Sequence, residues 1–124
     1  MRDYRGKRVD NGEWVYGYYI KYKRKSYILI PNAKSFLSGF IQVIPETVGQ
    51  SIGQNDESGK KIYQGDKVKG DPDGGHSIVS WNNFVCAWCL TKNGVCLYPG
   101  HDTYRWERLK IIGNIHDPDL KEKT

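Results

Sequence analysis

The sequence has no long hydrophobic segment. No stretch of the 124 residues approaches the roughly 18 consecutive apolar residues that a membrane-spanning helix needs. The first ten residues, MRDYRGKRVD, also lack the apolar run of a secretory signal peptide. We therefore expect a protein without a membrane partner.

Cysteine is scarce, with only three residues in the chain. A small and odd number of cysteines argues against the disulfide framework of a secreted domain. The cysteine count therefore favours a cytoplasmic location, where thiols stay reduced.

Helical periodicity is missing as well. No segment shows apolar residues at helical spacing over three turns, and no fixed-period repeat or low-complexity linker is visible. By contrast, the nine tyrosines, four tryptophans and fourteen glycines are typical of strands joined by tight turns. The chain is long enough for one domain, or for two small ones in close association. We predict a mainly β fold of short strands that closes into a small barrel.

The individual strands are predicted from alternation of apolar and polar residues. The first two, Glu13–Lys21 and Ser26–Ile30, form a hairpin around the basic turn Tyr22–Lys25, and Pro31 ends the second. Segment 32–38 is ambiguous between a loop and a helical turn. Further strands are expected at Phe40–Ile44, Ser77–Trp81, Phe84–Lys92, Val95–Tyr98 and the end of Arg105–Ile115.

The stretch from Gly53 to Gly70 is crowded with glycine and lysine, as phosphate-binding loops are. Such a loop needs Ser or Thr after its lysine and then a helix, but here an apolar, strand-like pair follows the two lysines. We therefore predict a turn at 53–59, a short strand at 60–63 and a second turn at 65–66, with Ile62 and Val68 in the core.

One cluster of residues has the composition of a zinc site. Cys86, Cys89, Cys96 and His101 supply three thiols and an imidazole, the ligand number of tetrahedral zinc. However, the first two cysteines lie in FVCAWCL, which we interpret as a strand, and strand alternation sends residues three apart to opposite faces. We predict that the cysteines are buried hydrophobic residues and that no metal is bound; zinc and a reactive thiol stay as alternatives.

Two other chemical patterns are incomplete. Asp71-x-Asp73 resembles the start of a calcium loop, but its twelfth position is Asn82 instead of Glu. The three histidines show no triad arrangement, although Cys89 or Cys96 could meet a distant histidine in space. We predict no catalytic residues, no cofactor and therefore no enzyme.

Positive charge is concentrated in the first fifty residues. Nine Lys and Arg face four Asp and Glu there, whereas the rest of the chain is neutral overall. Tyrosines are interleaved with these cations, and aromatic rings stack on unpaired bases while cations neutralise phosphates. The candidate nucleic-acid-binding residues are Tyr18, Lys21, Tyr22, Lys23, Arg24 and Lys25. The competing interpretation is that the tyrosines pack a sheet and that Lys23, Arg24 and Lys25 are merely a solvated hairpin tip.

Four segments carry a family resemblance: RGKRVDNGEWVYGYYI, PETVGQSIGQNDESGKKIYQGDKV, IVSWNN and LKIIGNIHDPDL. In this order they resemble the YopX family of phage and prophage proteins over nearly the whole chain. Small departures occur at 51–53 and at Gln64, and the cysteine-rich segment 86–96 does not belong to the family pattern. The resemblance implies a bacterial host cell, a β region over 1–50 packed with an SH3-like barrel over 51–124, and no known catalytic residues.

The sequence therefore favours a non-enzymatic phage or prophage accessory protein that acts as a binding module. Nucleic acid, contacted by the basic, tyrosine-rich hairpin, is the preferred partner. The alternative is a protein-interaction or self-assembling module that uses exposed aromatic residues to bind a second copy or another phage or host protein. The first function requires a positive face with exposed tyrosines, and the second requires an apolar aromatic patch.

Overall fold

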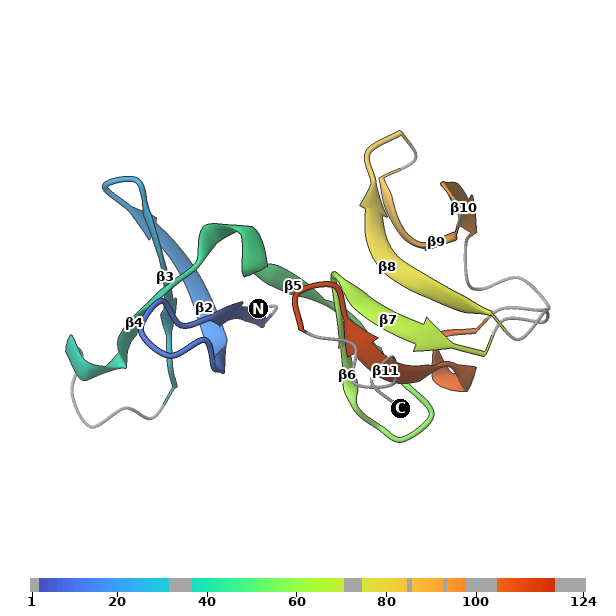
Figure 1. The fold of residues 1–124 in the computed structure, drawn as a ribbon, viewed down its shortest axis with the longest axis horizontal. Coiled ribbons are helices and arrows are strands. Elements are labelled where there is room, and N and C mark those ends of the chain that lie inside the picture. Colours follow the sequence, from blue (N-terminus) through green and yellow to red (C-terminus); the bar gives the residue numbers. More distant parts are fainter. Residues whose placement is uncertain are drawn as a thin grey trace. The chain divides into compact units, whose positions relative to one another are not determined.

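The computed structural model describes residues 3–31, 37–70, 75–84, 86–92, 94–97 and 105–117. These residues form eleven strands and three short 3-10 turns, and none of them lies in an α-helix (Figure 1). The prediction of a mainly β fold is confirmed. No helix in this part of the chain is long and apolar enough to cross a membrane. The expectations for 32–36, 71–74, Asn93 and His101 fall outside the described residues.

The chain divides into two compact units, Met1–Ser51 and Ile52–Thr124. The division falls inside strand β5 (Gly49–Asn55), which gives its first residues to one unit and its last residues to the other. Each unit has a hydrophobic core of its own.

The first unit is an antiparallel sheet with the strand order β4-β3-β2-β1-β5. Besides β5, it consists of β1 (Tyr4–Lys7), β2 (Trp14–Tyr22), β3 (Lys25–Leu29), β4 (Phe40–Val43) and the 3-10 turns η1 (Leu37–Gly39) and η2 (Pro45–Thr47). The predicted hairpin is confirmed, since β2 and β3 pair from Tyr18 opposite Leu29 to Tyr22 opposite Lys25 (Figure 1). Its turn is shorter than expected, because both Tyr22 and Lys25 belong to the strands.

One face of this sheet packs the core of the first unit. The core consists of Val15, Ile28 and Val43, with the partly buried Tyr4, Tyr19, Ile30, Ile41 and Val48 packed against it. Gly17 lies on the same face of β2 as Val15. A Cβ atom at Gly17 would collide with the backbone carbonyl of Leu29, so this position has no room for a side chain.

The second unit contains a five-stranded antiparallel sheet with the order β10-β9-β8-β7-β11, and β6 pairs with β5. Its elements are β6 (Lys61–Tyr63), β7 (Asp66–Lys69), β8 (His76–Asn82), β9 (Ala87–Lys92), β10 (Val95–Leu97), the 3-10 turn η3 (Trp106–Arg108) and β11 (Lys110–Asn114). Strands β10 and β11 are the two edges of the five-stranded sheet. Among the described strands, the predicted closure into an SH3-like barrel is therefore not found.

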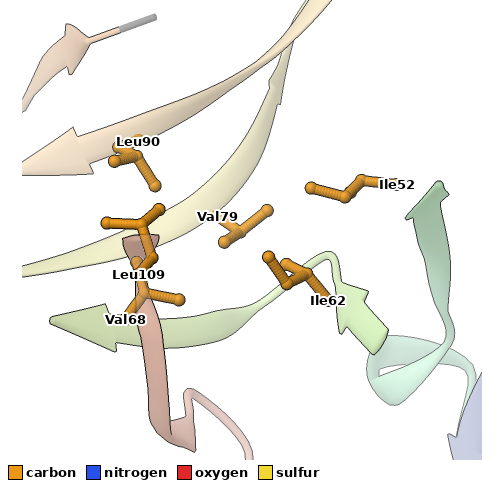
Figure 2. Close-up of a cluster of buried hydrophobic side chains, with 6 residues drawn as sticks. All are labelled: Ile52, Ile62, Val68, Val79, Leu90 and Leu109. Atoms are coloured by element: carbon orange, nitrogen blue, oxygen red, sulfur yellow. The ribbon is translucent and has the colours of Figure 1, made fainter. Parts of the chain in front are cut away.

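Six buried aliphatic side chains form the core of the second unit (Figure 2): Ile52, Ile62, Val68, Val79, Leu90 and Leu109. They come from β5, β6, β7, β8 and β9 and from the residue that follows η3. Burial of each contributes roughly 1.5–3 kcal/mol relative to exposure. Ile62 and Val68 are completely buried, which confirms the prediction for both.

The glycine-rich stretch after Ile52 contains more strand than we predicted. We expected a turn from Gly53, but β5 continues through Asn55, and the turn follows it. Ile52 is buried and β5 pairs with β6, so packing and pairing outweigh the local turn preference of glycine. The strand predicted at 60–63 is confirmed as β6.

Asp56 organises the turn that follows β5. Its carboxylate accepts hydrogen bonds from the backbone N–H groups of Ser58 and Lys60, both at 2.9 Å. It also accepts one from the backbone N–H of Ile111 on β11, at 3.1 Å. Burial raises the pKa of Asp56, but these hydrogen bonds and the charge of Lys60 outweigh that effect and hold the pKa below its usual value. In the stretch that resembled a phosphate loop, the Asp56 carboxylate thus accepts hydrogen bonds from backbone N–H groups of the protein itself.

The strand predicted at Phe84–Lys92 begins later, at Ala87. The described residues just before it, Asn83, Phe84 and Cys86, lie in turns, and the N–H of Phe84 donates to Oδ1 of Asn82 at 2.8 Å. Cys86 has a positive φ of 53°, which is incompatible with a strand. Phe84 is 95% exposed, so its side chain gains almost no burial that would favour strand pairing.

Candidate functional site

Side chains of related chemistry gather on the face of the first unit's sheet that lies opposite its core. Alternation along each strand and the register between strands place them there. We call this surface the aromatic face: it consists of Arg5, Lys7, Trp14, Tyr16, Tyr18, Ile20, Tyr22, Lys25, Tyr27, Leu29, Phe40 and Gln42. None of these residues is Asp or Glu, so the charge of the face is positive.

Strand β2 presents a row of exposed tyrosines on this face. The exposed fractions are 47% for Tyr16, 39% for Tyr18 and 59% for Tyr22. Neighbours on one face of a strand are separated by two residues, or about 6.8 Å. Large aromatic rings that are not covered by the protein's own core are typical of binding surfaces.

Trp14 begins the row and contacts two cations. The guanidinium carbon of Arg5 lies 4.5 Å from the centre of a Trp14 ring, and Nζ of Lys7 lies 5.5 Å from a ring centre. Both distances fall within the range of about 6 Å for cation–π attraction. Arg5 is buried, whereas Lys7 is partly exposed.

The hairpin tip adds further positive charge to the end of the row. Lys23 and Arg24 form the two-residue turn, with φ angles of 49° and 70°. Lys25 lies directly opposite Tyr22, and Nζ of Lys23 is 5.3 Å from the centre of the Tyr22 ring. Three consecutive cations therefore lie next to the most exposed tyrosine of the row.

A hollow of about 430 Å³ lies beside this tip and is lined by Ile20, Tyr22, Tyr27 and Phe40. The surface that these residues expose to it is entirely apolar. The rings of Tyr27 and Phe40 pack edge to face, with centroids 6.3 Å apart. The hollow has the size of a small-ligand site, which is typically about 300–1,000 Å³.

The structure separates the six predicted site residues. Tyr18, Tyr22 and Lys25 lie on the aromatic face, and Lys23 and Arg24 form the adjoining turn. Lys21 pairs with the buried Ser26, so alternation places it on the opposite face.

Sequence reasoning missed several members of the aromatic face. Trp14 and Tyr16 could have been found, because the residues at 14, 16, 18, 20 and 22 are all apolar or aromatic and share one strand face. Phe40 could not have been found in this way. It joins the face only through the pairing of β3 with β4, and short-range sequence patterns do not determine that pairing.

All three cysteines lie in the second unit. Cys89 is buried, whereas Cys86 and Cys96 are exposed. The prediction of buried cysteines is therefore wrong for these two, since Cys86 lies in a turn and Cys96 on the edge strand β10. No group of three His, Cys, Asp or Glu side chains within the described residues is arranged to hold a metal.

Two of these thiols have shifted acidities. Burial raises the pKa of Cys89. The pKa of Cys96 is lowered, first by a hydrogen bond with Cys89 and then by hydrogen bonds with Asn82 and Thr91. Nδ2 of Asn82 donates to Sγ of Cys96 at 3.4 Å, and Oγ1 of Thr91 is 3.9 Å from both sulfurs. Cys96 is therefore the more acidic and more accessible thiol of the pair.

The β8–β9 hairpin of the second unit also exposes aromatic side chains. Trp81 and Trp88 lie opposite each other and pack edge to face, with ring centroids 5.1 Å apart. Trp81 is 43% exposed, and Phe84 in the turn is almost completely exposed. Within the described residues of this hairpin, no cluster of cations is comparable to that of the hairpin tip in the first unit.

Comparison with known families identifies the chain. The model of the YopX protein family matches residues 3–120. The chain belongs to the YopX family. This match spans nearly the whole sequence and confirms the resemblance that the four sequence segments indicated. Comparison with curated proteins found no similar sequence.

Proposed function

We propose that this YopX family member is a non-enzymatic accessory protein of phage type that binds single-stranded nucleic acid through its aromatic face. The observation that carries the proposal is the row of exposed tyrosines on β2, which ends at three consecutive cations. Stacking of a base on an aromatic ring is worth about 1–3 kcal/mol, and Lys and Arg neutralise the phosphates. The aromatic face combines both elements on one rigid sheet.

The spacing of the row favours a single strand over a duplex. Neighbouring rings on one strand face are about 6.8 Å apart. Stacked bases in a duplex rise by only about 3.4 Å per base. Consecutive tyrosines can therefore accept neighbouring bases only after those bases have separated from one another, as they do in an extended single strand.

The hairpin tip supports the proposal because its residues differ from those that its turn conformation favours. A two-residue turn with positive φ at both positions favours Asn-Gly, because these residues tolerate the left-handed conformation. Here Lys23 and Arg24 occupy it, and backbone strain of this kind costs on the order of 1 kcal/mol per residue. Departures from local preference are expected where the side chains serve a function.

The proposal is non-enzymatic because the aromatic face lacks the usual catalytic groups. It contains no His, Cys, Asp or Glu, the side chains that most often act as general acids, bases or nucleophiles. In the second unit, the buried carboxylates of Asp56 and Asp66 accept backbone hydrogen bonds, so their observed role is structural.

Fluorescence anisotropy with labelled oligonucleotides tests the proposal. A single-stranded 12-mer should bind more tightly than the corresponding duplex. If three phosphates are contacted, the single-strand affinity should fall by roughly 20-fold between 50 and 200 mM salt. Absence of binding to any single strand, or an affinity that does not change with salt, would contradict the proposal.

A second candidate function is binding of a protein partner or of a second copy through the aromatic residues of the β8–β9 hairpin. Phe84 favours it, because a phenylalanine that is 95% exposed gains burial from almost any apolar contact. Light scattering distinguishes the self-assembling form of this function. Concentration-dependent dimers that Phe84→Ser abolishes would support it, whereas a strict monomer at high concentration would exclude self-assembly.

A further inference from the structure

We infer that the hollow beside the hairpin tip holds one unpaired base and that this position requires a base without selecting its identity. The inference rests on the proposed function and specifies how the aromatic face treats one nucleotide of a bound strand. Tyr22 belongs both to the row along β2 and to the lining of the hollow, whereas Tyr16 and Tyr18 are not among the lining residues.

The walls of the hollow suit a flat, apolar ring. Tyr22, Tyr27 and Phe40 supply three aromatic side chains, and Ile20 supplies an aliphatic one. Tyr27 and Phe40 meet at 87°, so their ring planes are nearly perpendicular and the two side chains buttress each other. A volume of about 430 Å³ is enough for one base together with part of its sugar.

The cations beside the hollow are positioned to contact the phosphate of a bound nucleotide. Lys25 lies opposite Tyr22, and Lys23 lies over the Tyr22 ring, so both cations border the same wall of the hollow. A base inside the hollow therefore has its phosphate within reach of at least one lysine. This arrangement makes a nucleotide a better occupant than an uncharged apolar side chain, which would leave both cations without a complementary charge.

The apolar lining predicts how the base is recognised. The four bases are distinguished by the pattern of donors and acceptors at their edges, so selection among them requires polar partners. The described residues that line the hollow expose none to it. Every base has a flat face that can stack, and recognition by stacking alone tolerates all four.

Single abasic substitutions test this inference directly. Five labelled pentanucleotides, each with an abasic site at a different position, are compared with the intact strand by anisotropy. We expect one position at which loss of the base weakens binding by about 5- to 150-fold. Exchange of the base at that position among A, C, G and T should change the affinity by less than about threefold.

Two variants assign the sensitive position to the hollow. Tyr22→Ala should remove most of the abasic penalty, because the wall that the base contacts is then absent. Tyr16→Ala is the matched control: it removes another exposed tyrosine ring of the same strand face, outside the hollow, so it should weaken binding but keep the penalty.

The possible results separate this inference from the proposed function. If the pentanucleotides bind but every abasic site is tolerated, or if one base is preferred by more than about tenfold, the inference is wrong and the proposed function stands. Retention of the full penalty in Tyr22→Ala would also overturn it. If no intact strand binds, the proposed function itself fails.

Discussion

Lys21 and Ser26 lie directly opposite each other in the β2–β3 hairpin, and Ser26 is buried. One residue further along, Tyr22 and Lys25 form the next pair, and their side chains point to the other face. Two lysines that are close in the sequence are therefore separated by the sheet. Only Lys25 belongs to the aromatic face.

This separation gives a matched pair of charge substitutions. Lys25→Gln should weaken binding of a single strand several-fold and reduce the slope of log K against log salt by about 0.7, because one phosphate contact is lost. Lys21→Gln removes the same charge from the opposite face and should leave both quantities unchanged. Equal effects of the two substitutions in an anisotropy titration would show that only net charge matters and would contradict a binding face.

The strained turn predicts opposite changes in stability and binding. The double substitution Lys23→Asn and Arg24→Gly replaces two strained residues with the pair that this turn prefers, so stability should rise by about 1 kcal/mol. In a unit of this size, 1 kcal/mol corresponds to roughly 4–8 °C in melting temperature. Affinity for a single strand should fall, because two cations are lost.

An intermediate variant removes one cation of the turn and relieves the strain at one of its two positions. Lys23→Asn alone keeps Arg24 and should give an intermediate gain in melting temperature and an intermediate loss of affinity. Thermal melting by circular dichroism and oligonucleotide titration on the same samples measure both quantities. A double variant that melts at a lower temperature would show that the turn is not strained.

The lowered pKa of Asp56 predicts a pH-dependent contribution to the stability of the second unit. This lowered pKa stabilises the folded state at pH values above the usual aspartate range, and this contribution is lost as pH falls through the folded-state pKa. Asp56→Asn should therefore cost about 2–4 kcal/mol at pH 7, since charged acceptance of three backbone N–H groups is lost. The stability difference from the wild type should shrink below about pH 4.

Urea denaturation monitored by tryptophan fluorescence measures this difference at several pH values. Asp10→Asn is the control, because Asp10 is an exposed carboxylate that pairs with Arg8 at 2.8 Å on the surface of the first unit. It should change stability little at any pH. A constant difference between wild type and Asp56→Asn from pH 7 to pH 3 would contradict the assigned role of the carboxylate.

The thiols predict a pattern of alkylation. In the folded protein, iodoacetamide should modify Cys86 and Cys96 and leave the buried Cys89 protected. Cys89→Ala removes the strongest hydrogen bond that lowers the pKa of Cys96, so Cys96 should react more slowly at pH 7.5. Peptide mapping by mass spectrometry follows each site, with Cys86 as the internal control. Equal rates at Cys89 and Cys96 in the wild type would show that the folded state does not protect Cys89.

The sequence predicted the elements whose local signals agree with their packing. The β2–β3 hairpin has alternating aromatic residues, and the segment around Ile62 and Val68 combines strand preference with burial. Both predictions were confirmed. Other predictions failed where local chemistry and packing disagree. Gly53 lies in a strand because its neighbour Ile52 is buried, and the apolar Phe84 lies in a turn.

The sequence predicted the residue types of the candidate site but not their arrangement on the sheet. The interleaved tyrosines and lysines indicated a binding segment, but the six residues chosen from it belong to two faces and a turn. Alternate residues of a strand point to opposite faces of the sheet, and this alternation places Lys21 on the core side and Tyr16 on the aromatic face. The hollow requires Phe40 from β4, and its position depends on a register that short-range sequence patterns do not determine.

Strand β5 makes the junction between the two units a shared piece of secondary structure. Gly49 and Gln50 pair with β1, and Ile52 contributes to the core of the second unit. A fragment that ended before Gly49 would leave β1 without one of its neighbours, and a fragment that began after Ile52 would lack a core residue. Exchange of either unit between family members therefore has to preserve an unbroken strand across residues 49–55, because no linker is present there to absorb a mismatch.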